Sequence, residues 1–247
     1  MRLEINPTAE INGKRAAKCV ARLLNKTIKE NGEARLLVST GASQFQMFEA
    51  LIKEKVDWTK VEMFHLDEYV NLPYEHPASF RKYLNERFIN HVPLKAAYLV
   101  DNNIPYLTEK IKEKPIDIGL IGIGENGHIA FNDPPADFDT DEAYIIVDLD
   151  EKCKAQQVGE GWFENLDAVP KQAISMTVNQ IMKCKHIVSV VPNAVKAEAV
   201  FNTLTKPISN MVPATMLKRH SDWRLFIDYN SAKLIYNEGD CNGCDCE

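Results

Sequence analysis

The sequence lacks any apolar run of the roughly eighteen residues that a membrane-spanning helix needs, so no membrane protein is predicted. It also lacks an excess of positive charge, because 29 lysine and arginine residues stand against 35 aspartate and glutamate residues. The net charge of −6, without a basic stripe, disfavours a nucleic-acid partner. The opening residues MRLEINPTAEINGK show no signal-peptide pattern, which favours a cytoplasmic location.

Cysteine is sparse except near the C-terminal end. Three cysteines lie in predicted helices, where a buried reduced thiol is the simplest interpretation: Cys19, Cys153 and Cys184. The other three crowd the last stretch of the sequence: Cys241, Cys244 and Cys246. Three thiols at this spacing could hold a soft metal, but a structural zinc site usually needs four ligands. A polar tail without metal is therefore the favoured interpretation.

Linker-like composition is missing too: there is no proline- or serine-rich stretch, repeat or low-complexity tract before that end. The 247 residues are 45% hydrophobic and 26% charged, as in ordinary globular proteins, and supply enough apolar material for a full core. We therefore predict one domain over residues 1–236 and a cysteine-rich polar tail over residues 237–247.

Short apolar runs alternate with amphipathic segments along the chain. The predicted strands are residues 34–39, 61–66, 117–123, 144–149, 186–191 and 224–228. The predicted helices include residues 44–52, 77–91 and 194–203, the second with Pro77 near its start. This alternation predicts βαβ units and an α/β fold with a mainly parallel sheet covered on both faces.

In open parallel sheets, ligands bind beyond the carboxyl ends of the strands. The first predicted strand ends in Thr40-Gly41-Ala42-Ser43, whose amides and hydroxyls could cradle a phosphate, although serine and threonine also cap helices generally. The next ends at Asp67 and Glu68, which could be a general base and its neighbour or only a solvated turn.

A glycine-rich run, GIGENGHIAFNDP over residues 122–134, follows the third strand. Three glycines in six residues let the backbone approach a ligand closely. The run matches GxGxxG, but the next segment does not read as a helix, so it is no dinucleotide fingerprint. It also places His128 among polar neighbours at the sheet edge, where proton transfer is favoured over a structural role.

After the strand at residues 186–191, Lys196 falls in the first turn of a predicted helix. A cation is unfavourable there because it opposes the helix dipole. An anionic ligand would explain this lysine, and a solvated surface position is the alternative.

The segments STGAS, FHLDEY, HPASF, IGIGENGHIAFNDP and VPNAVK resemble, in order and spacing, the glucosamine-6-phosphate deaminase (isomerase) family. The resemblance covers residues 34–228. Lactonase relatives on the same fold continue differently after their Gly-His pair, which favours the amino-sugar branch. The resemblance implies a single three-layer α/β/α Rossmann-like domain. It also implies an enzyme that converts glucosamine 6-phosphate to fructose 6-phosphate and ammonia without a metal or redox cofactor.

The resemblance also implies roles for individual residues. Asp67 would move the proton between C2 and C1, His128 would assist ring opening at the ring oxygen, and Asp133 would support that histidine. The phosphate would contact the following residues: Thr40, Gly41, Ala42, Ser43, Lys154 and Lys196.

The chain departs from the family pattern at several positions. Asn126 replaces an aspartate and Asp133 a glutamate, and an amide beside a histidine orients the ring without adding charge. Lys154 replaces an arginine, which keeps the charge but loses the bidentate fork. Regulated members hold an allosteric sugar phosphate with basic residues where residues 137–142 are acidic here, so we expect no such site.

Two alternatives stay open at this point. The substrate could be galactosamine 6-phosphate or another sugar phosphate, because the residues that select the C4 epimer cannot be placed. The chain could also be a sugar-phosphate sensor without catalysis, although it has no room for a leading helix-turn-helix and keeps Asp67 and His128. The expected partner is a small amino-sugar phosphate, and a homo-oligomer is left open.

Overall fold

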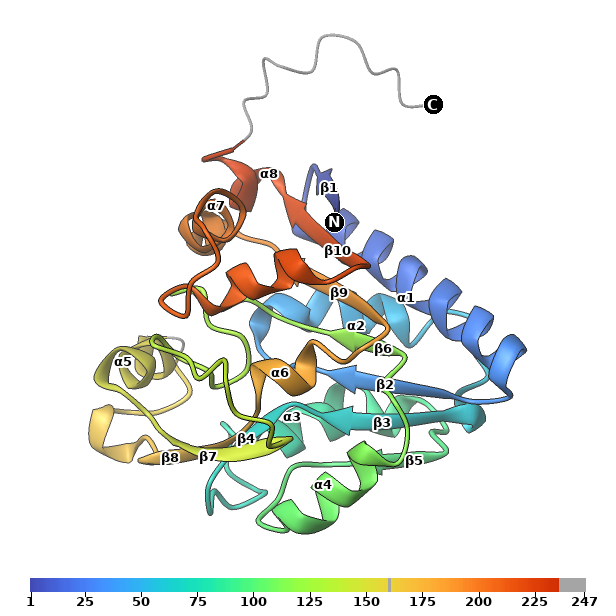
Figure 1. Cartoon of the computed structure of the whole chain (residues 1–247), viewed down its shortest axis with the longest axis horizontal. Coiled ribbons are helices and arrows are strands. Elements are labelled where there is room, and N and C mark those ends of the chain that lie inside the picture. Colours follow the sequence, from blue (N-terminus) through green and yellow to red (C-terminus); the bar gives the residue numbers. More distant parts are fainter. Residues whose placement is uncertain (160, 236–247) are drawn as a thin grey trace, which may run out of the picture.

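A seven-stranded sheet lies at the centre of the chain, whose computed structural model describes residues 1–159 and 161–235 (Figure 1). Its strands are β1 (Arg2–Asn6), β2 (Ala34–Val38), β3 (Val61–His65), β5 (Ala96–Tyr98), β6 (Ile118–Leu120), β9 (His186–Val191) and β10 (Trp223–Asp228). In the order β1-β10-β9-β6-β2-β3-β5, every neighbouring pair is parallel. The predicted mainly parallel sheet is confirmed.

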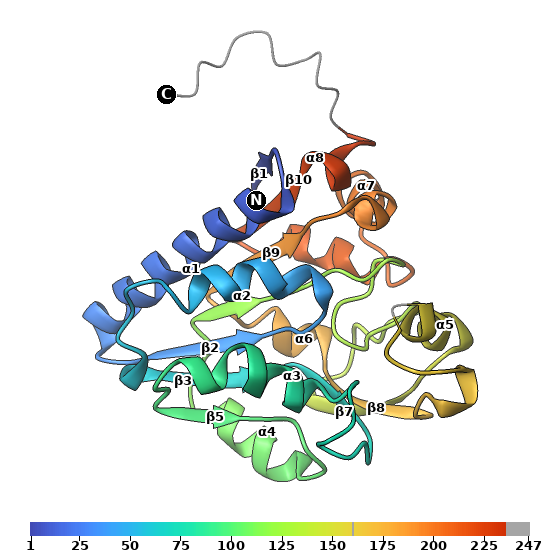
Figure 2. The same ribbon diagram turned by 180° about the vertical axis from the view of Figure 1, so that it is seen from behind.

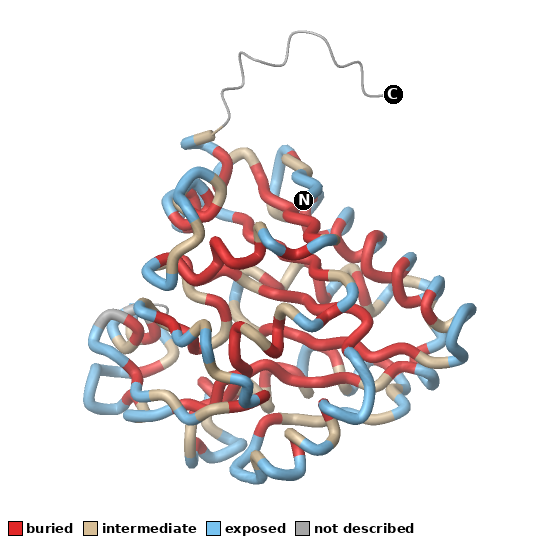
Figure 3. Tube along the Cα trace, in the orientation of Figure 1, coloured by how far each residue is buried: buried red, intermediate tan, exposed pale blue. Residues whose placement is uncertain are grey.

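Helices cover both faces of this sheet (Figure 2). On one face lie α1 (Ala9–Asn31), α2 (Phe45–Leu51) and α3 (Phe80–Arg87); on the other lie α4 (Ile104–Lys112), α6 (Val178–Ile181), α7 (Ala197–Thr205) and α8 (Tyr229–Ala232). Successive strand residues point to opposite faces, so Leu37 packs in one core while Leu36 and Val38 pack in the other. The two central strands, β2 and β6, are buried throughout (Figure 3). The three-layer α/β/α arrangement is therefore confirmed.

A second, three-stranded sheet lies beside the first and is antiparallel. It consists of β4 (Asp67–Tyr69), β8 (Gln172–Met176) and β7 (Tyr144–Asp148). The prediction that residues 144–149 join the parallel series is wrong. Burial alternates along β7, and Ile146 is half exposed, as in an antiparallel sheet with one face in water. Helix α5 (Glu151–Gly159) covers the other face through a small core that contains Phe131, Cys153 and Phe163.

The predicted helix over residues 77–91 is also corrected. Helix α3 begins only at Phe80, because the Ser79 side chain accepts a hydrogen bond from the Lys82 backbone N–H and so caps the first turn. Pro77 lies in the preceding turn, and Ile89–His91 forms a separate 3₁₀ turn. The shorter helix leaves residues 76–79 as a loop at the carboxyl edge of the large sheet.

The strand order places a crevice between β2 and β6. From β2 the chain proceeds through β3 to β5 on one side, whereas β6 leads through β9 to β10 on the other. The loops that follow two such strands separate, and this is where parallel α/β sheets bind ligands. No helix in the described ranges is both long and apolar enough to cross a membrane.

Candidate active site

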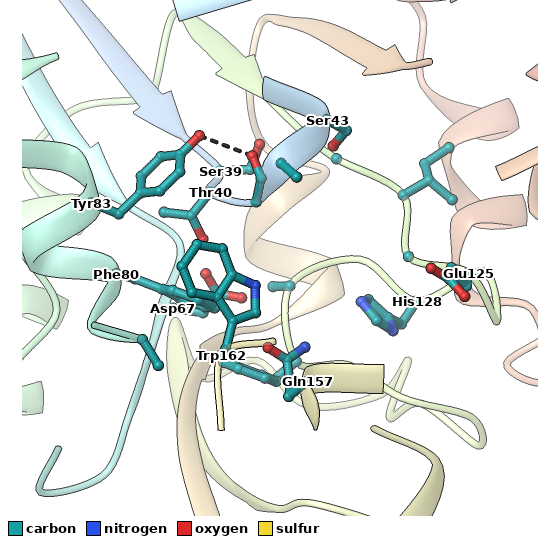
Figure 4. Close-up of a pocket in the computed structure, with 18 of the residues that line it drawn as sticks. Ser39, Thr40, Ser43, Asp67, Phe80, Tyr83, Glu125, His128, Gln157 and Trp162 are labelled. Carbon is teal, nitrogen blue, oxygen red and sulfur yellow. Dashed lines mark hydrogen bonds between the residues drawn. The ribbon is translucent and has the colours of Figure 1, made fainter. Parts of the chain in front are cut away.

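A cavity of about 550 Å³ opens at this crevice (Figure 4). It is lined by residues from all four strand ends that the sequence singled out: the turn after β2, Asp67, the loop after β6 and the turn after β9. The loop before α3 and one side of α5 complete its walls. The topology therefore brings together segments that lie far apart in the sequence.

Asp67 on β4 faces this cavity and is only 7% exposed. Burial raises the pKa of its carboxyl group, and the charge of neighbouring Glu68 raises it further, to about 8. Within the described ranges, no group donates a hydrogen bond that would offset this rise. A carboxylate in such surroundings is a much stronger base than one in water, as removal of a proton from carbon requires.

The loop after β6 carries His128, whose Nδ1 lies 3.0 Å from Asp133 Oδ1. The two atoms are in close contact, but the geometry is not that of a well-aligned hydrogen bond. Burial opposes ionisation of Asp133, but its contacts with His128, Asn126 and Cys153 outweigh burial, so the pKa of Asp133 lies below its usual value. With Nδ1 directed at Asp133, the opposite ring nitrogen, Nε2, is the one available to a ligand.

Asn126 does not support the imidazole directly, which corrects the expected arrangement. Its Nδ2 donates to Asp133 Oδ1 at 3.0 Å, and its Oδ1 accepts from the His128 backbone N–H at 3.0 Å. The group beside the histidine ring is therefore the carboxylate of Asp133, and the amide of Asn126 ties that carboxylate to the loop. Asn126 and Asp133 lie behind His128 and are not among the described residues that line the cavity.

The glycines of this loop make room for the protein's own side chains. A Cβ on Gly124 would lie 2.1 Å from His128 Nε2, so only glycine leaves space for the imidazole. Gly127 has φ +85°, which favours glycine, and a Cβ there would also meet Val212 Cγ1 at 2.8 Å. The expected role of letting the backbone approach a ligand is thus, at Gly124, the role of seating a histidine.

The turn Thr40 to Ser43 lines one end of the cavity. Gly41 takes φ +105°, and Tyr83 Oη donates to its carbonyl oxygen at 2.9 Å, which fixes the turn against α3 (Figure 4). Ala42 begins a 3₁₀ turn that leads into α2. Lys196 lines the same cavity from the N-cap of α7 and is 9% exposed, so the interpretation as a solvated surface lysine is wrong.

The structure does not bring Lys154 to this end of the cavity. Its ammonium lies 3.7 Å from Glu151 Oε1, and it is absent from the described residues of the cavity wall. The reason is the orientation of α5, which buries Cys153 and Gln157. Gln157 lines the cavity and its Oε1 accepts a 2.7 Å hydrogen bond from the Tyr69 hydroxyl.

An aromatic wall was not predicted from the sequence. Phe80, Phe131 and Trp162 line the cavity, and the rings of Phe80 and Phe131 stack at 5.8 Å between centroids. The three residues come from separate segments, so no spacing in the sequence connects them. Apolar walls lower the local dielectric constant and so strengthen the charge effects at Asp67.

Two expectations concern metal ligands and the C-terminal tail. The described residues contain no group of three or more histidine, cysteine, aspartate or glutamate side chains arranged to hold a metal ion. The tail with Cys241, Cys244 and Cys246 lies outside the described residues, as does the proposed domain limit at residue 236. These two expectations stay predictions.

Residues 7–226 match the sequence pattern of the family described as glucosamine-6-phosphate isomerases/6-phosphogluconolactonase. The chain belongs to this family. The family resemblance seen in the sequence motifs is thereby confirmed. Glucosamine-6-phosphate deaminases from Bacillus cytotoxicus and Bacillus cereus are each 34% identical to it over 220 residues, which cover 86% of this chain and 82% of the relative.

Solved structures agree with this membership. A monomeric glucosamine-6-phosphate deaminase superposes with a TM-score of 0.84 at 30% identity, covering 95% of this chain and 100% of that one. A 6-phosphogluconolactonase from Trypanosoma brucei superposes with a TM-score of 0.77 at 12% identity, covering 95% and 98%. The second likeness extends to the fold alone.

Proposed function

We propose that this family member is a glucosamine-6-phosphate deaminase that forms fructose 6-phosphate and ammonia. The observation that carries the proposal is the buried carboxyl group of Asp67, whose pKa is raised and which faces the same cavity as His128 and Lys196. The named deaminase relatives support it, because they are similar along most of the chain.

The substrate phosphate binds at the turn end of the cavity. Amides and hydroxyls of Thr40 to Ser43 surround its oxygens, and Lys196 supplies positive charge. Lys154 is left out of this set because it pairs with Glu151. Fixing the phosphate orients C1 and C2 toward Asp67.

Ring opening comes first. Protonated His128 gives its Nε2 proton to the ring oxygen while the anomeric hydroxyl loses its proton, and the open-chain aldehyde results. Asp133, held by Asn126, lies 3.0 Å from Nδ1 and keeps the imidazole oriented.

Asp67 then removes the proton from C2 while the ammonium group passes one proton to the C1 oxygen, which gives an enolamine, and Asp67 returns its proton to C1. The product of this step is an iminium at C2. Water adds to that carbon, and ammonia leaves from the carbinolamine, so the atoms balance without a redox change. The cationic amino group of the substrate favours ionised Asp67 when it enters the cavity.

The test is ammonia release from glucosamine 6-phosphate, with galactosamine 6-phosphate and free glucosamine as comparison substrates. We expect release mainly from the first, and a fall of roughly 10²–10⁴-fold in Asp67→Asn. Faster release from the galactosamine epimer would move the assignment to that substrate. Tight binding of either sugar phosphate without ammonia would favour the sensor.

A homo-oligomer and a cytoplasmic location stay predictions. Sedimentation velocity at the assay concentration checks the oligomeric state.

A further inference from the structure

Two adjacent acidic side chains on β4 point in opposite directions, as alternation along a strand requires. Asp67 lines the large cavity, whereas Glu68 lines a second cavity of about 280 Å³ together with Arg81. Glu68 is 1% exposed, and it contacts none of the groups to which the reaction assigns a role. A buried acid next to the base, outside the substrate cavity, requires an explanation of its own.

Glu68 is fully engaged by its surroundings. Its Oε2 accepts hydrogen bonds from Ser79 Oγ at 3.1 Å, the Arg81 backbone N–H at 2.9 Å and Arg81 Nε at 3.3 Å. Its Oε1 accepts from the Tyr69 backbone N–H at 3.0 Å. Because Ser79 caps α3, these bonds fasten the amino-terminal end of that helix to β4.

The fastened end of α3 is also a wall of the substrate cavity. Pro77, Ala78, Ser79 and Phe80 all line it. Glu68 therefore connects the strand that carries the base to the wall that faces the base, through one carboxylate.

We propose that Glu68 is a positioning residue for the reaction at Asp67: it fixes β4 against the 77–80 wall and holds its own carboxylate beside the base. The inference rests on the proposed function, in which Asp67 is the base.

Glu68 also supplies the neighbouring charge that raises the pKa of Asp67 and so controls when Asp67 is ionised. On the Asp67 side, burial raises the pKa values of Tyr144 and Cys153, so both stay neutral. On β3, burial and the Arg81 charge lower the pKa of His65 to about 3, so it is neutral as well. His128 lies across the cavity, and Asp101 lines the second cavity beside Glu68.

Control of this kind has a chemical use. In the empty cavity, Glu68 and burial keep much of Asp67 protonated near neutral pH. A substrate that brings a cationic amino group offsets the Glu68 charge, and Asp67 then ionises where its proton acceptor is needed. A sugar phosphate without a cationic amino group would not offset the Glu68 charge, so Glu68 contributes to the selection of an amino sugar.

The test compares Glu68→Gln and Arg81→Gln by two measurements. The first follows the Asp67 carboxyl group by ¹³C NMR titration without substrate, with Asp67→Asn to assign the signal. The second is the pH dependence of kcat/KM for ammonia release. We expect Glu68→Gln to move the Asp67 midpoint to lower pH by roughly one unit, because a like charge is removed. Arg81→Gln should move it to higher pH.

Asp101→Asn is the matched control, because Asp101 lines the second cavity but makes no hydrogen bond to Glu68 in the described structure. In this variant, the titration midpoint of Asp67 should not move. If Glu68→Gln lowers the rate equally at all pH values and leaves the NMR midpoint in place, Glu68 is only structural and the inference is overturned. Should Glu68→Gln fail to fold, Ser79→Ala, which removes one hydrogen bond to Glu68 Oε2, is measured in its place, and unchanged kcat/KM at every pH in that variant overturns the positioning role.

The two measurements also separate this inference from the proposed function. A wild-type protein that releases no ammonia contradicts the function, while the NMR titration still decides whether Glu68 controls Asp67. Normal ammonia release with unmoved midpoints leaves the function intact and removes the role of Glu68.

Discussion

The two edges of the large parallel sheet differ in whether their polar and charged side chains are paired. At the amino edge, acidic and basic side chains pair with one another: Glu33 contacts Lys95 at 2.5 Å and also contacts Lys114, and Glu62 contacts Lys95 at 2.9 Å. At the carboxyl edge, no described group donates a hydrogen bond to the Asp67 carboxylate, and Ser39 Oγ is buried with no hydrogen-bond partner in the described structure.

The backbone follows the same division. Asn193, which lines the cavity, takes φ +81°, a conformation that costs a residue with a side chain of order 1–3 kcal/mol. It is held there by a 3.0 Å hydrogen bond from its N–H to Asp228 Oδ1. Polar side chains at the amino edge therefore pair with one another and stabilise the fold. Polar groups at the carboxyl edge stay available to bind a ligand.

The largest expected effect at the amino edge comes from Arg35. Its side chain is 2% exposed, donates to carbonyl oxygens of Lys110, Ile111 and Lys114 at the end of α4, and lies 3.4 Å from Glu62. Arg35→Met should lower the free energy of unfolding by about 3–5 kcal/mol, because these groups lose their buried partner. Urea denaturation measures this change.

The matched control for Arg35→Met is Lys53→Met, which removes only the exposed pair with Glu49 and should cost less than about 1 kcal/mol. Equal losses in the two variants would remove the distinction between buried and exposed charges at this edge.

Much of this comparison could be anticipated from the sequence. The four strand ends were placed together by the rule for parallel sheets, and β9 has the predicted limits, residues 186–191. The strand at 144–149 and the helix at 77–91 were misjudged, because pairing with β8 and the cap at Ser79 depend on neighbours that an apolar pattern does not reveal.

The site was predictable in part for the same reason. Residues directly after a strand, such as Asp67, inherit a position from the sheet. Lys154 lies on α5, and the rotation of that helix about its axis depends on packing against Phe131 and Phe163, which the sequence does not encode locally. The link from Asn126 to Asp133 likewise depends on the fold of a loop.

At the carboxyl edge, Gly124→Ala should displace the His128 ring, because the new Cβ would lie 2.1 Å from Nε2. We expect kcat to fall by roughly 10²-fold, as for other small displacements of a catalytic group. Gly159→Ala serves as the control for a methyl group added elsewhere on the cavity wall, since a Cβ there meets no described atom within 4 Å. Steady-state kinetics of both variants decide the point, and equal kcat values would show that the ring tolerates the methyl group.

Lys196→Ala removes the positive charge from the end of the cavity where we propose that the substrate phosphate binds. Loss of a charge-assisted hydrogen bond costs about 1.5–3 kcal/mol, so KM for glucosamine 6-phosphate should rise about 10- to 100-fold. Binding of free glucosamine, measured by calorimetry, should not change. A similar loss for both sugars would mean that Lys196 holds the fold of the turn rather than the phosphate.

A further effect concerns stability and has a defined pH dependence. Because the pKa of Asp67 rises to about 8 on folding, the folded state keeps a proton that the unfolded state releases near pH 4. Its contribution to stability is complete below pH 4 and is lost as pH rises through about 8. Asp67→Asn should therefore gain stability over wild type between pH 5 and 9, by at least about 1.4 kcal/mol for each unit of pKa difference. If the urea midpoints of wild type and Asp67→Asn change with pH in parallel, this prediction is contradicted.

The most direct test of the central claim, that Asp67 carries the proton between C2 and C1, is turnover of glucosamine 6-phosphate in D₂O followed by NMR of the product. One carboxylate on one face should deliver solvent deuterium to only one of the two C1 positions, and Asp67→Asn should lose both this labelling and ammonia release. Deuterium at both C1 positions, or ammonia release by Asp67→Asn near the wild-type rate, would contradict the account.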